Sequence, residues 1–193
     1  ATRDSAVISS ILNYRDSHGV PVVSVSINGR GYSFLFDTGA GMTCISDKVV
    51  SEVGLSLRLT SNYIVGIDGI IGANALTDFV VTFDAKSGTI TLLRHVLDEQ
   101  VDWIPMKLWD GLPLLALKLR GKEELYDVPG VFDSGSSMGA FGLPSVKGFE
   151  EWTAAGLIDS VEEGQGTTTL MLGGRVGMDK LYRGKLQECH IGS

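Results

Sequence analysis

The chain has 193 residues, a formal net charge of −7 at pH 7 and 44% hydrophobic residues, which is ordinary for a soluble globular protein. The acidic balance and the lack of a basic run argue against a nucleic-acid partner, because phosphate binding needs a basic surface. Apolar stretches such as "LPLLALKL" are too short for a membrane span, so none is predicted.

The first half begins with patterns typical of extended structure. Residues 6–19 are compatible with a short helix or an edge strand, of which the strand is favoured, and the stretch "VPVVSVSINGRGYSFLFD" follows them. In that stretch an Asn28-Gly29 pair separates two β-rich runs, which predicts a β-hairpin whose second strand leads into Asp37. Apolar residues at positions 45, 49, 50 and 53 then predict a short helix that ends at Gly54.

The middle of the chain predicts further strands and then a connection. The element Ile70-Ile71-Gly72 precedes a short helix, a strand over 79–83, a turn at 86–88 and a strand over 89–93. Acidic residues and a final proline make 95–105 the expected linker. We therefore expect two domains, with boundaries 1–97 and 98–193.

The second half repeats the order of the first. "LPLLALKLRG" opens with an aliphatic-Pro-aliphatic pattern, as Val20-Pro21-Val22 does, and the following stretch runs extended into Asp133. "SVKGFEEWTAAGL" then predicts a helix that ends near Gly156. Two copies of one pattern predict a two-lobed, all-β architecture with a few short helices.

Each copy contains one short motif, "FDTGAG" at 36–41 and "FDSGSS" at 132–137. An aspartate that ends a strand needs a sharp turn after it, which Gly39 and Gly135 permit. We expect Phe36 and Phe132 to anchor both strand ends in an apolar wall. The small hydroxyl residues that follow each aspartate, Thr38 and Ser134, suit hydrogen bonds across the site.

Two such loops would bring the Asp37 and Asp133 carboxylates close together. Like charges a few ångströms apart repel by about 4 kcal/mol at an effective dielectric of about 20, so the pair shares one proton. The ionised carboxylate then deprotonates a water, while the protonated one donates to a carbonyl oxygen. This chemistry hydrolyses an amide without a cofactor. His18, His95 and His190 show no ligand spacing, so no metal site is expected.

The chain resembles the aspartic protease family, and within it the bacterial retropepsin-like aspartyl proteases, through "VPVVSVSINGRGYSFLFDTGAGMTCIS", "IDGIIGANAL", "LPLLALKLRG" and "VFDSGSS". The resemblance implies an endopeptidase that cleaves peptides bound in extended conformation between two retropepsin-like lobes. It implies Asp37 and Asp133 as the catalytic pair, with Ile70, Ile71 and Gly72 packed beneath the loop. The implied loop-supporting residues are Thr38, Gly39, Ala40, Ser134, Gly135 and Ser136. Ser136, unlike Ala40, is able to hydrogen-bond a carboxylate.

The sequence departs from this family pattern in two places. Only "SLRLTSNYIVG" separates Leu55 from Ile67, which is short for the hairpin flap of the family. The second half offers only Met171-Leu172-Gly173 as its hydrophobic-hydrophobic-Gly element, so we expect an incomplete second lobe. Related bacterial proteins often carry a further peptide-binding domain after the protease unit, which leaves such a domain beyond the end of this sequence as an open alternative.

Several alternatives stay open at the level of sequence. One is a dimeric protease that uses Asp37 alone, and another is an inactive or latent peptide-binding module on the same fold. Cys44 and Cys189 either pair or lie apart as buried thiols. The resemblance and the low cysteine count favour the periplasm, the cell envelope or secretion.

Overall fold

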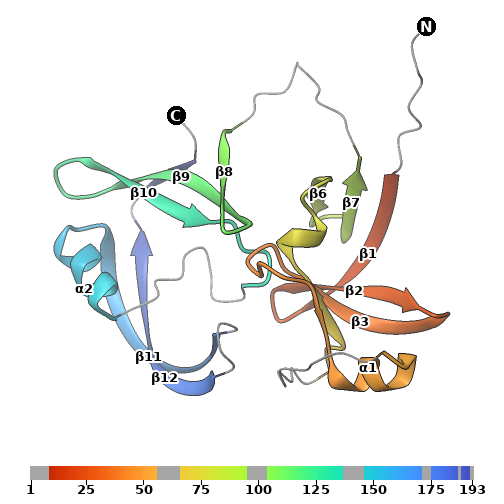
Figure 1. Ribbon diagram of the computed structural model, residues 1–193. Coiled ribbons are helices and arrows are strands. Elements are labelled where there is room, and N and C mark those ends of the chain that lie inside the picture. Colours follow the sequence, from red (N-terminus) through yellow and green to blue (C-terminus); the bar gives the residue numbers. More distant parts are fainter. Residues whose placement is uncertain are drawn as a thin grey trace, which may run out of the picture. The chain divides into compact units, whose positions relative to one another are not determined.

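A computed structural model of the chain describes residues 9–55, 66–94, 104–136, 146–170, 175–186 and 188–191 (Figure 1). The chain divides into two compact units. The first contains Ala1–Asp102, Trp109–Pro113 and Asp133–Ser137, and the second contains Trp103–Leu108, Leu114–Phe132 and Met138–Ser193. The first unit therefore includes both D-[ST]-G motifs. The short flap segment, most of the expected linker and Met171-Leu172-Gly173 lie outside the described residues.

A seven-stranded sheet forms the first unit, in the order β4-β5-β3-β2-β1-β7-β6. Neighbouring strands are antiparallel, except that β3 and β5 are parallel. The strands are β1 Ser9–Ser17, β2 Val20–Ile27, β3 Arg30–Phe36, β4 Cys44–Ile45, β5 Gly69–Ile71, β6 Val80–Asp84 and β7 Thr89–Leu93. The β-rich fold expected from the sequence is confirmed.

The β2–β3 hairpin confirms the turn predicted from Asn28-Gly29. Both residues have positive φ, 51° and 79°, and Ile27 pairs with Arg30 across the turn. Two positive φ values match the twist of the flanking strands, which explains why Asn and Gly occupy these positions. The hairpin delivers Phe36 to the end of β3 and Asp37 immediately after it.

Helix α1 spans Asp47–Val53, as the apolar spacing predicted. The Ser46 side chain accepts a hydrogen bond from the Val49 N–H at the start, and Gly54 ends the helix with φ 72°. Caps of this kind each stabilise a helix by about 1 kcal/mol. Val49 and Val50 are the buried face of α1.

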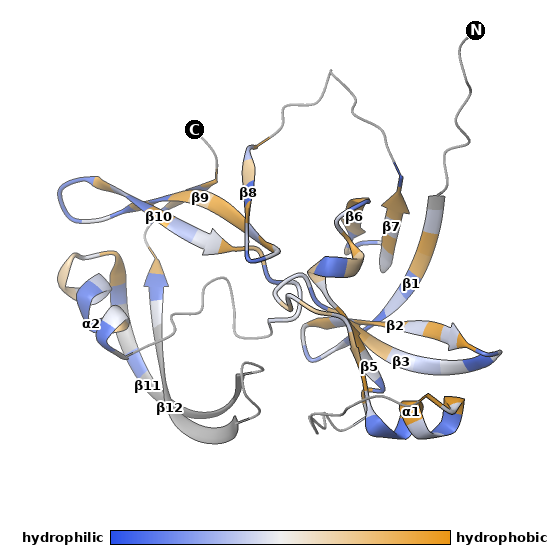
Figure 2. Cartoon of the chain, in the orientation of Figure 1, coloured by the Kyte–Doolittle hydropathy of each residue, from blue (hydrophilic) through white to orange (hydrophobic). Residues whose placement is uncertain are grey.

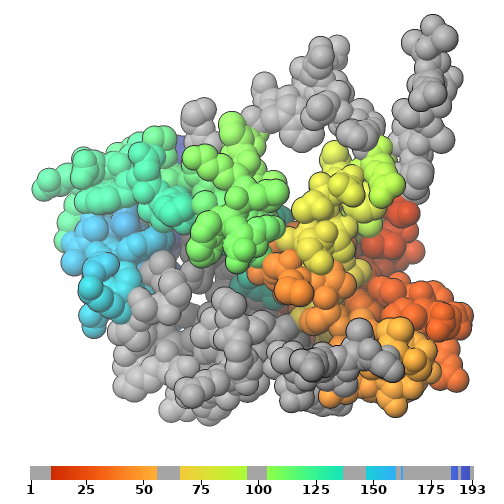
Figure 3. All heavy atoms as spheres, viewed as in Figure 1, coloured from red at the N-terminus to blue at the C-terminus, as the bar shows by residue number. Residues whose placement is uncertain are grey.

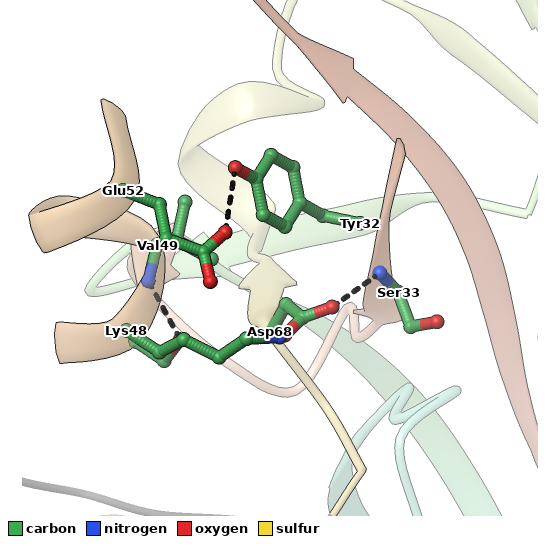
Figure 4. A network of polar contacts seen from close by, with 7 residues as sticks. Tyr32, Ser33, Lys48, Val49, Glu52 and Asp68 are labelled. Atoms are coloured by element: carbon green, nitrogen blue, oxygen red, sulfur yellow. Dashed lines mark hydrogen bonds and ion pairs between the residues drawn. The ribbon is translucent and has the colours of Figure 1, made fainter. Parts of the chain in front are cut away.

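Polar contacts fasten α1 to the sheet (Figure 4). The Asp68 carboxylate accepts hydrogen bonds from the Ser33 N–H at 2.9 Å and from Lys48 Nζ at 3.0 Å. The buried Tyr32 hydroxyl donates to Glu52 at 3.1 Å. Asp68, which precedes β5, therefore connects β3 to α1 rather than taking part in the D-[ST]-G loops.

The core of the first unit lies beneath the start of the Asp37 loop. Phe36, Val49 and Ile90 are fully buried, and the Phe36 ring packs edge-on against Phe83 with centroids 5.5 Å apart. Figure 2 shows hydrophobic residues along the strands and on one part of α1. Because Phe36 is fixed in this core, the backbone at Asp37 leaves the sheet from a rigid point.

The second unit is also β-rich. Strand β9 pairs with β8, β10 and β13, while β11 and β12 form a separate long hairpin. Its core includes Leu119 and Leu157. The elements are β8 Met106–Trp109, β9 Leu112–Arg120, β10 Leu125–Val131, α2 Val146–Ala154, β11 Ile158–Leu170, β12 Arg175–Leu186 and β13 Cys189–Ile191.

The two halves share local backbone geometry. His18 and Gly19 turn with φ 58° and 88° before β2, and Asp110 and Gly111 turn with φ 50° and 82° before β9. Each turn leads into a strand whose second residue is proline, and each strand is followed by another that leads to an aspartate. The repeated order of elements predicted from the sequence is present. The predicted domain boundary at 97/98 stays a prediction.

Candidate active site

The loops that contain Asp37 and Asp133 meet within the first unit and bind each other reciprocally. The Thr38 N–H donates to Ser134 Oγ at 3.1 Å, and the Ser134 N–H donates to Thr38 Oγ1 at 3.0 Å. The Ser134 hydroxyl donates in turn to the Phe36 carbonyl oxygen at 2.9 Å. Each hydroxyl residue thus fixes the backbone of the opposite loop.

Each aspartate is also held by its own loop. The Gly39 N–H donates to Asp37 Oδ1 at 2.9 Å, and the Gly135 N–H donates to Asp133 Oδ1 at 2.8 Å. Asp37 Oδ1 accepts a second hydrogen bond, from the Ala40 N–H at 3.1 Å. The same turn therefore orients both carboxylates, although their sequence contexts differ.

The two glycines allow the opposite carboxyl groups to approach. A Cβ on Gly39 would lie 2.5 Å from Asp133 Oδ1, and a Cβ on Gly135 would lie 2.5 Å from Asp37 Oδ1. Real Cβ atoms do not come that close to other heavy atoms. Neither glycine has a positive φ, so glycine is required here for the close approach of the carboxyl groups and not, as the sequence suggested, for the turn.

The aspartates differ in their exposure. Asp37 is buried, with 8% of its surface accessible, whereas Asp133 is exposed. Burial, the nearby charge of Asp133 and a hydrogen bond between the two carboxyl groups raise the pKa of Asp37 to about 6. The hydrogen bonds from Gly39 and Ala40 act in the opposite direction. The pair consequently retains a proton up to about pH 6.

The Ile70-Ile71-Gly72 element lies directly beside the Asp37 loop. The Asp37 N–H donates to the Ile71 carbonyl at 3.0 Å, and the Ala73 N–H donates to the Ala40 carbonyl at 2.7 Å. A Cβ on Gly72 would lie 2.7 Å from that same carbonyl oxygen. Figure 3 shows orange atoms, the colour of residues near 40–50, adjoining yellow atoms, the colour of residues near 75.

Two expectations about side chains near the site are wrong. Phe36 is fully buried, as expected, but Phe132 is 48% exposed and does not sit in an apolar wall. Cys44 and Cys189 are free, which agrees with the unpaired alternative, but both are exposed and not buried as expected. Ser136 is half-buried, and its proposed bond to a carboxylate stays a prediction.

Thr43 and Asn74 contact each other beside the loop, and the sequence did not predict a role for either residue. They are 31 residues apart, and neither lies in a sequence motif that would indicate a functional role. The turn at Asp110 was likewise not predicted to lie near the loop, although its carbonyl oxygen would lie 3.7 Å from a Cβ on Gly41. Among the residues that the structure describes, no group of three His, Cys, Asp or Glu is placed to hold a metal ion.

Comparison with known proteins gives one match. Residues 23–80 match the family model described as "gag-polyprotein putative aspartyl protease". No curated protein and no solved structure matches the chain. The matched segment contains most of the β2–β3 hairpin, the Asp37 loop and the Ile70-Ile71-Gly72 element, but not Asp133. Over this segment the chain is similar to that aspartyl protease family, and the match supports a peptidase in general terms.

Proposed function

We propose that the protein is an aspartic endopeptidase in which Asp37 and Asp133 activate a water molecule together. The observation that carries this proposal is the reciprocal hydrogen bonding of the two D-[ST]-G loops, which sets each carboxyl group against the glycine of the opposite loop. Burial and the charge of Asp133 raise the pKa of Asp37 to about 6, so the pair shares a proton. Two carboxyl groups that share a proton supply an acid and a base at one place.

In this mechanism Asp37 carries the shared proton, because it is the buried partner, and the exposed Asp133 acts as the base. Asp133 takes a proton from the water molecule while the water oxygen attacks the peptide carbonyl carbon. Asp37 donates its proton to the carbonyl oxygen, which gives a neutral tetrahedral intermediate. Collapse of that intermediate returns a proton to Asp37 and breaks the C–N bond, while Asp133 protonates the departing amine.

The substrate class follows from the family, whose members act on peptides. We propose a peptide or protein substrate bound in extended conformation, since backbone hydrogen bonds then recognise it with little regard to sequence. In the part of the chain that the structure describes, no helix is long and apolar enough to cross a membrane.

The geometry favours a site made from one chain. Asp37 and Asp133 approach within the first unit, and the reciprocal bonds between Thr38 and Ser134 use residues of the same molecule. The dimeric alternative, in which Asp37 would pair with its copy in a second chain, needs this arrangement to open. We therefore propose both aspartates of one chain as the catalytic pair.

The decisive experiment is cleavage of an unbiased peptide library between about pH 3 and pH 8. It compares the wild type with Asp37→Asn and Asp133→Asn, and with Asp78→Asn as a matched control, because the Asp78 side chain is 76% exposed on the same unit. Loss of cleavage in the first two variants alone supports the proposal. Activity that survives in Asp133→Asn would instead indicate the dimeric site, and an inactive wild type that binds peptides would indicate a binding module.

A further inference from the structure

We propose that Asn74 is a positioning residue for this reaction, and that it acts on Asp37 through Thr43. The two side chains form what we call the Asn74–Thr43 clamp. The inference rests on the proposed function, and it adds a residue that neither contacts the reacting atoms nor belongs to the D-[ST]-G motifs.

The clamp depends on a single oxygen atom. Asn74 Oδ1 accepts hydrogen bonds from the Thr43 N–H at 2.7 Å and from the Thr43 hydroxyl at 2.9 Å. Because the hydroxyl proton is directed to Asn74, the lone pairs of Thr43 Oγ1 are free to accept, and they receive the Gly72 N–H at 3.0 Å. Asn74 therefore fixes both the backbone and the side chain of Thr43.

The clamp fixes the Thr43 end of the segment 37–43, which begins at Asp37. Two further hydrogen bonds join this segment to residues 71–73. The Ala73 N–H donates to the Ala40 carbonyl at 2.7 Å, and the Asp37 N–H donates to the Ile71 carbonyl at 3.0 Å. Residues 37–43 are thus bonded to residues 71–74 at their start, middle and end. Without the clamp, the end at Thr43 would lose its two bonds to Asn74.

This segment supplies the donors that orient Asp37. The N–H groups of Gly39 and Ala40 both bind Asp37 Oδ1, at 2.9 and 3.1 Å. Displacing Ala40 weakens its bond to the carboxylate, and small losses of orientation reduce catalytic rates severely. The expected signature is a lower kcat rather than weaker substrate binding, since the clamp does not contact the peptide.

Burial separates this role from a general role in folding. Asn74 and Thr43 are both exposed, so truncating either one leaves no cavity in the core. Thr77, also exposed, provides a matched control: its hydroxyl donates at 3.3 Å to the backbone carbonyl of Asn74 and takes no part in the clamp. Thr77→Val removes a neighbouring hydrogen bond of similar exposure and leaves the clamp intact.

The test measures kcat, KM and the titration of Asp37 in the full chain. The variants are Asn74→Ala, Thr43→Val, the double variant, Thr43→Ser and Thr77→Val. The Asp37 carboxyl is followed by ¹³C NMR and assigned with Asp37→Asn. We expect Asn74→Ala and Thr43→Val each to lower kcat about tenfold with KM nearly unchanged. We also expect both to shift the Asp37 titration to higher pH, because bonds that lower its pKa are weakened.

The kcat of the double variant should be no lower than that of the less active single variant, because both substitutions break the same clamp. Thr43→Ser keeps the hydroxyl and should behave as the wild type. Unchanged kcat and titration in Asn74→Ala would overturn the proposal, as would equal losses in Thr77→Val. If the wild type cleaves no peptide, the proposed function fails, while the NMR titration still decides whether the clamp positions Asp37.

Discussion

Gly39 lies against the carboxyl group of Asp133, and Gly135 lies against that of Asp37, so each glycine leaves room for the aspartate of the opposite loop. This relationship is reciprocal although the two aspartates differ in burial. It makes both glycines a requirement of the paired site.

Gly39→Ala should therefore disrupt the site. The new methyl group overlaps the Asp133 carboxyl, which must move, and such overpacking costs about 1–3 kcal/mol of stability. Gly41→Ala is the matched control, because its nearest neighbours lie at 3.7 Å or beyond. Peptide cleavage and urea unfolding should both change in Gly39→Ala and stay nearly unchanged in Gly41→Ala. Equal behaviour of the two variants would contradict the close approach.

Ser134→Ala should loosen the connection between the loops. The variant removes the acceptor of the Thr38 N–H and the donor to the Phe36 carbonyl, and we expect it to cost about 2 kcal/mol of stability together with most of the activity. Ser26→Ala, on the exposed face of β2, is the control and should change neither. Denaturant unfolding of both variants measures the difference.

The raised pKa of Asp37 makes stability depend on pH. The unfolded chain releases this proton near pH 4, whereas the folded chain keeps it to about pH 6, so stability falls as pH rises across this window. Asp37→Asn removes the effect. It should be more stable than the wild type by about 3 kcal/mol at about pH 7.5, and by much less at about pH 4. If the free energies of unfolding of the two proteins differed by the same amount at every pH in this range, a raised pKa of Asp37 would be excluded.

The same pKa should determine how the proposed peptide cleavage depends on pH. Because the proposed mechanism needs one proton on the pair, peptide cleavage should decline as pH rises through about 6. A pH profile of kcat/KM, which reports groups of the free enzyme, is the measurement. Full activity at about pH 8 would mean that Asp37 does not serve as the acid.

Much of the fold could be predicted because its signals are local. Asn28-Gly29 specifies its turn, Gly54 ends its helix, and β7 spans the residues predicted from alternation and the preceding turn. The pairing of the two D-[ST]-G loops could be anticipated because the motif repeats.

Features that depend on contacts between distant residues could not be predicted. The motif is nearly the same at Phe36 and Phe132, yet one ring is buried and the other is half exposed. The unequal burial of Asp37 and Asp133 likewise depends on what packs around each loop. Asn74 gives no local signal, because its importance lies in a partner 31 residues away.

The bonds between Thr38 and Ser134 also constrain how the protein folds. They join residues that are 96 positions apart, so this contact closes a long loop and carries a larger entropic cost than any hairpin in the first unit. Contacts of such high sequence separation are expected to form slowly. During synthesis β1 to β7 emerge before Ser134 does, so the sheet can assemble while the paired aspartates are still apart. In a nascent chain the seven-stranded sheet would then form before the two aspartates of the proposed site meet.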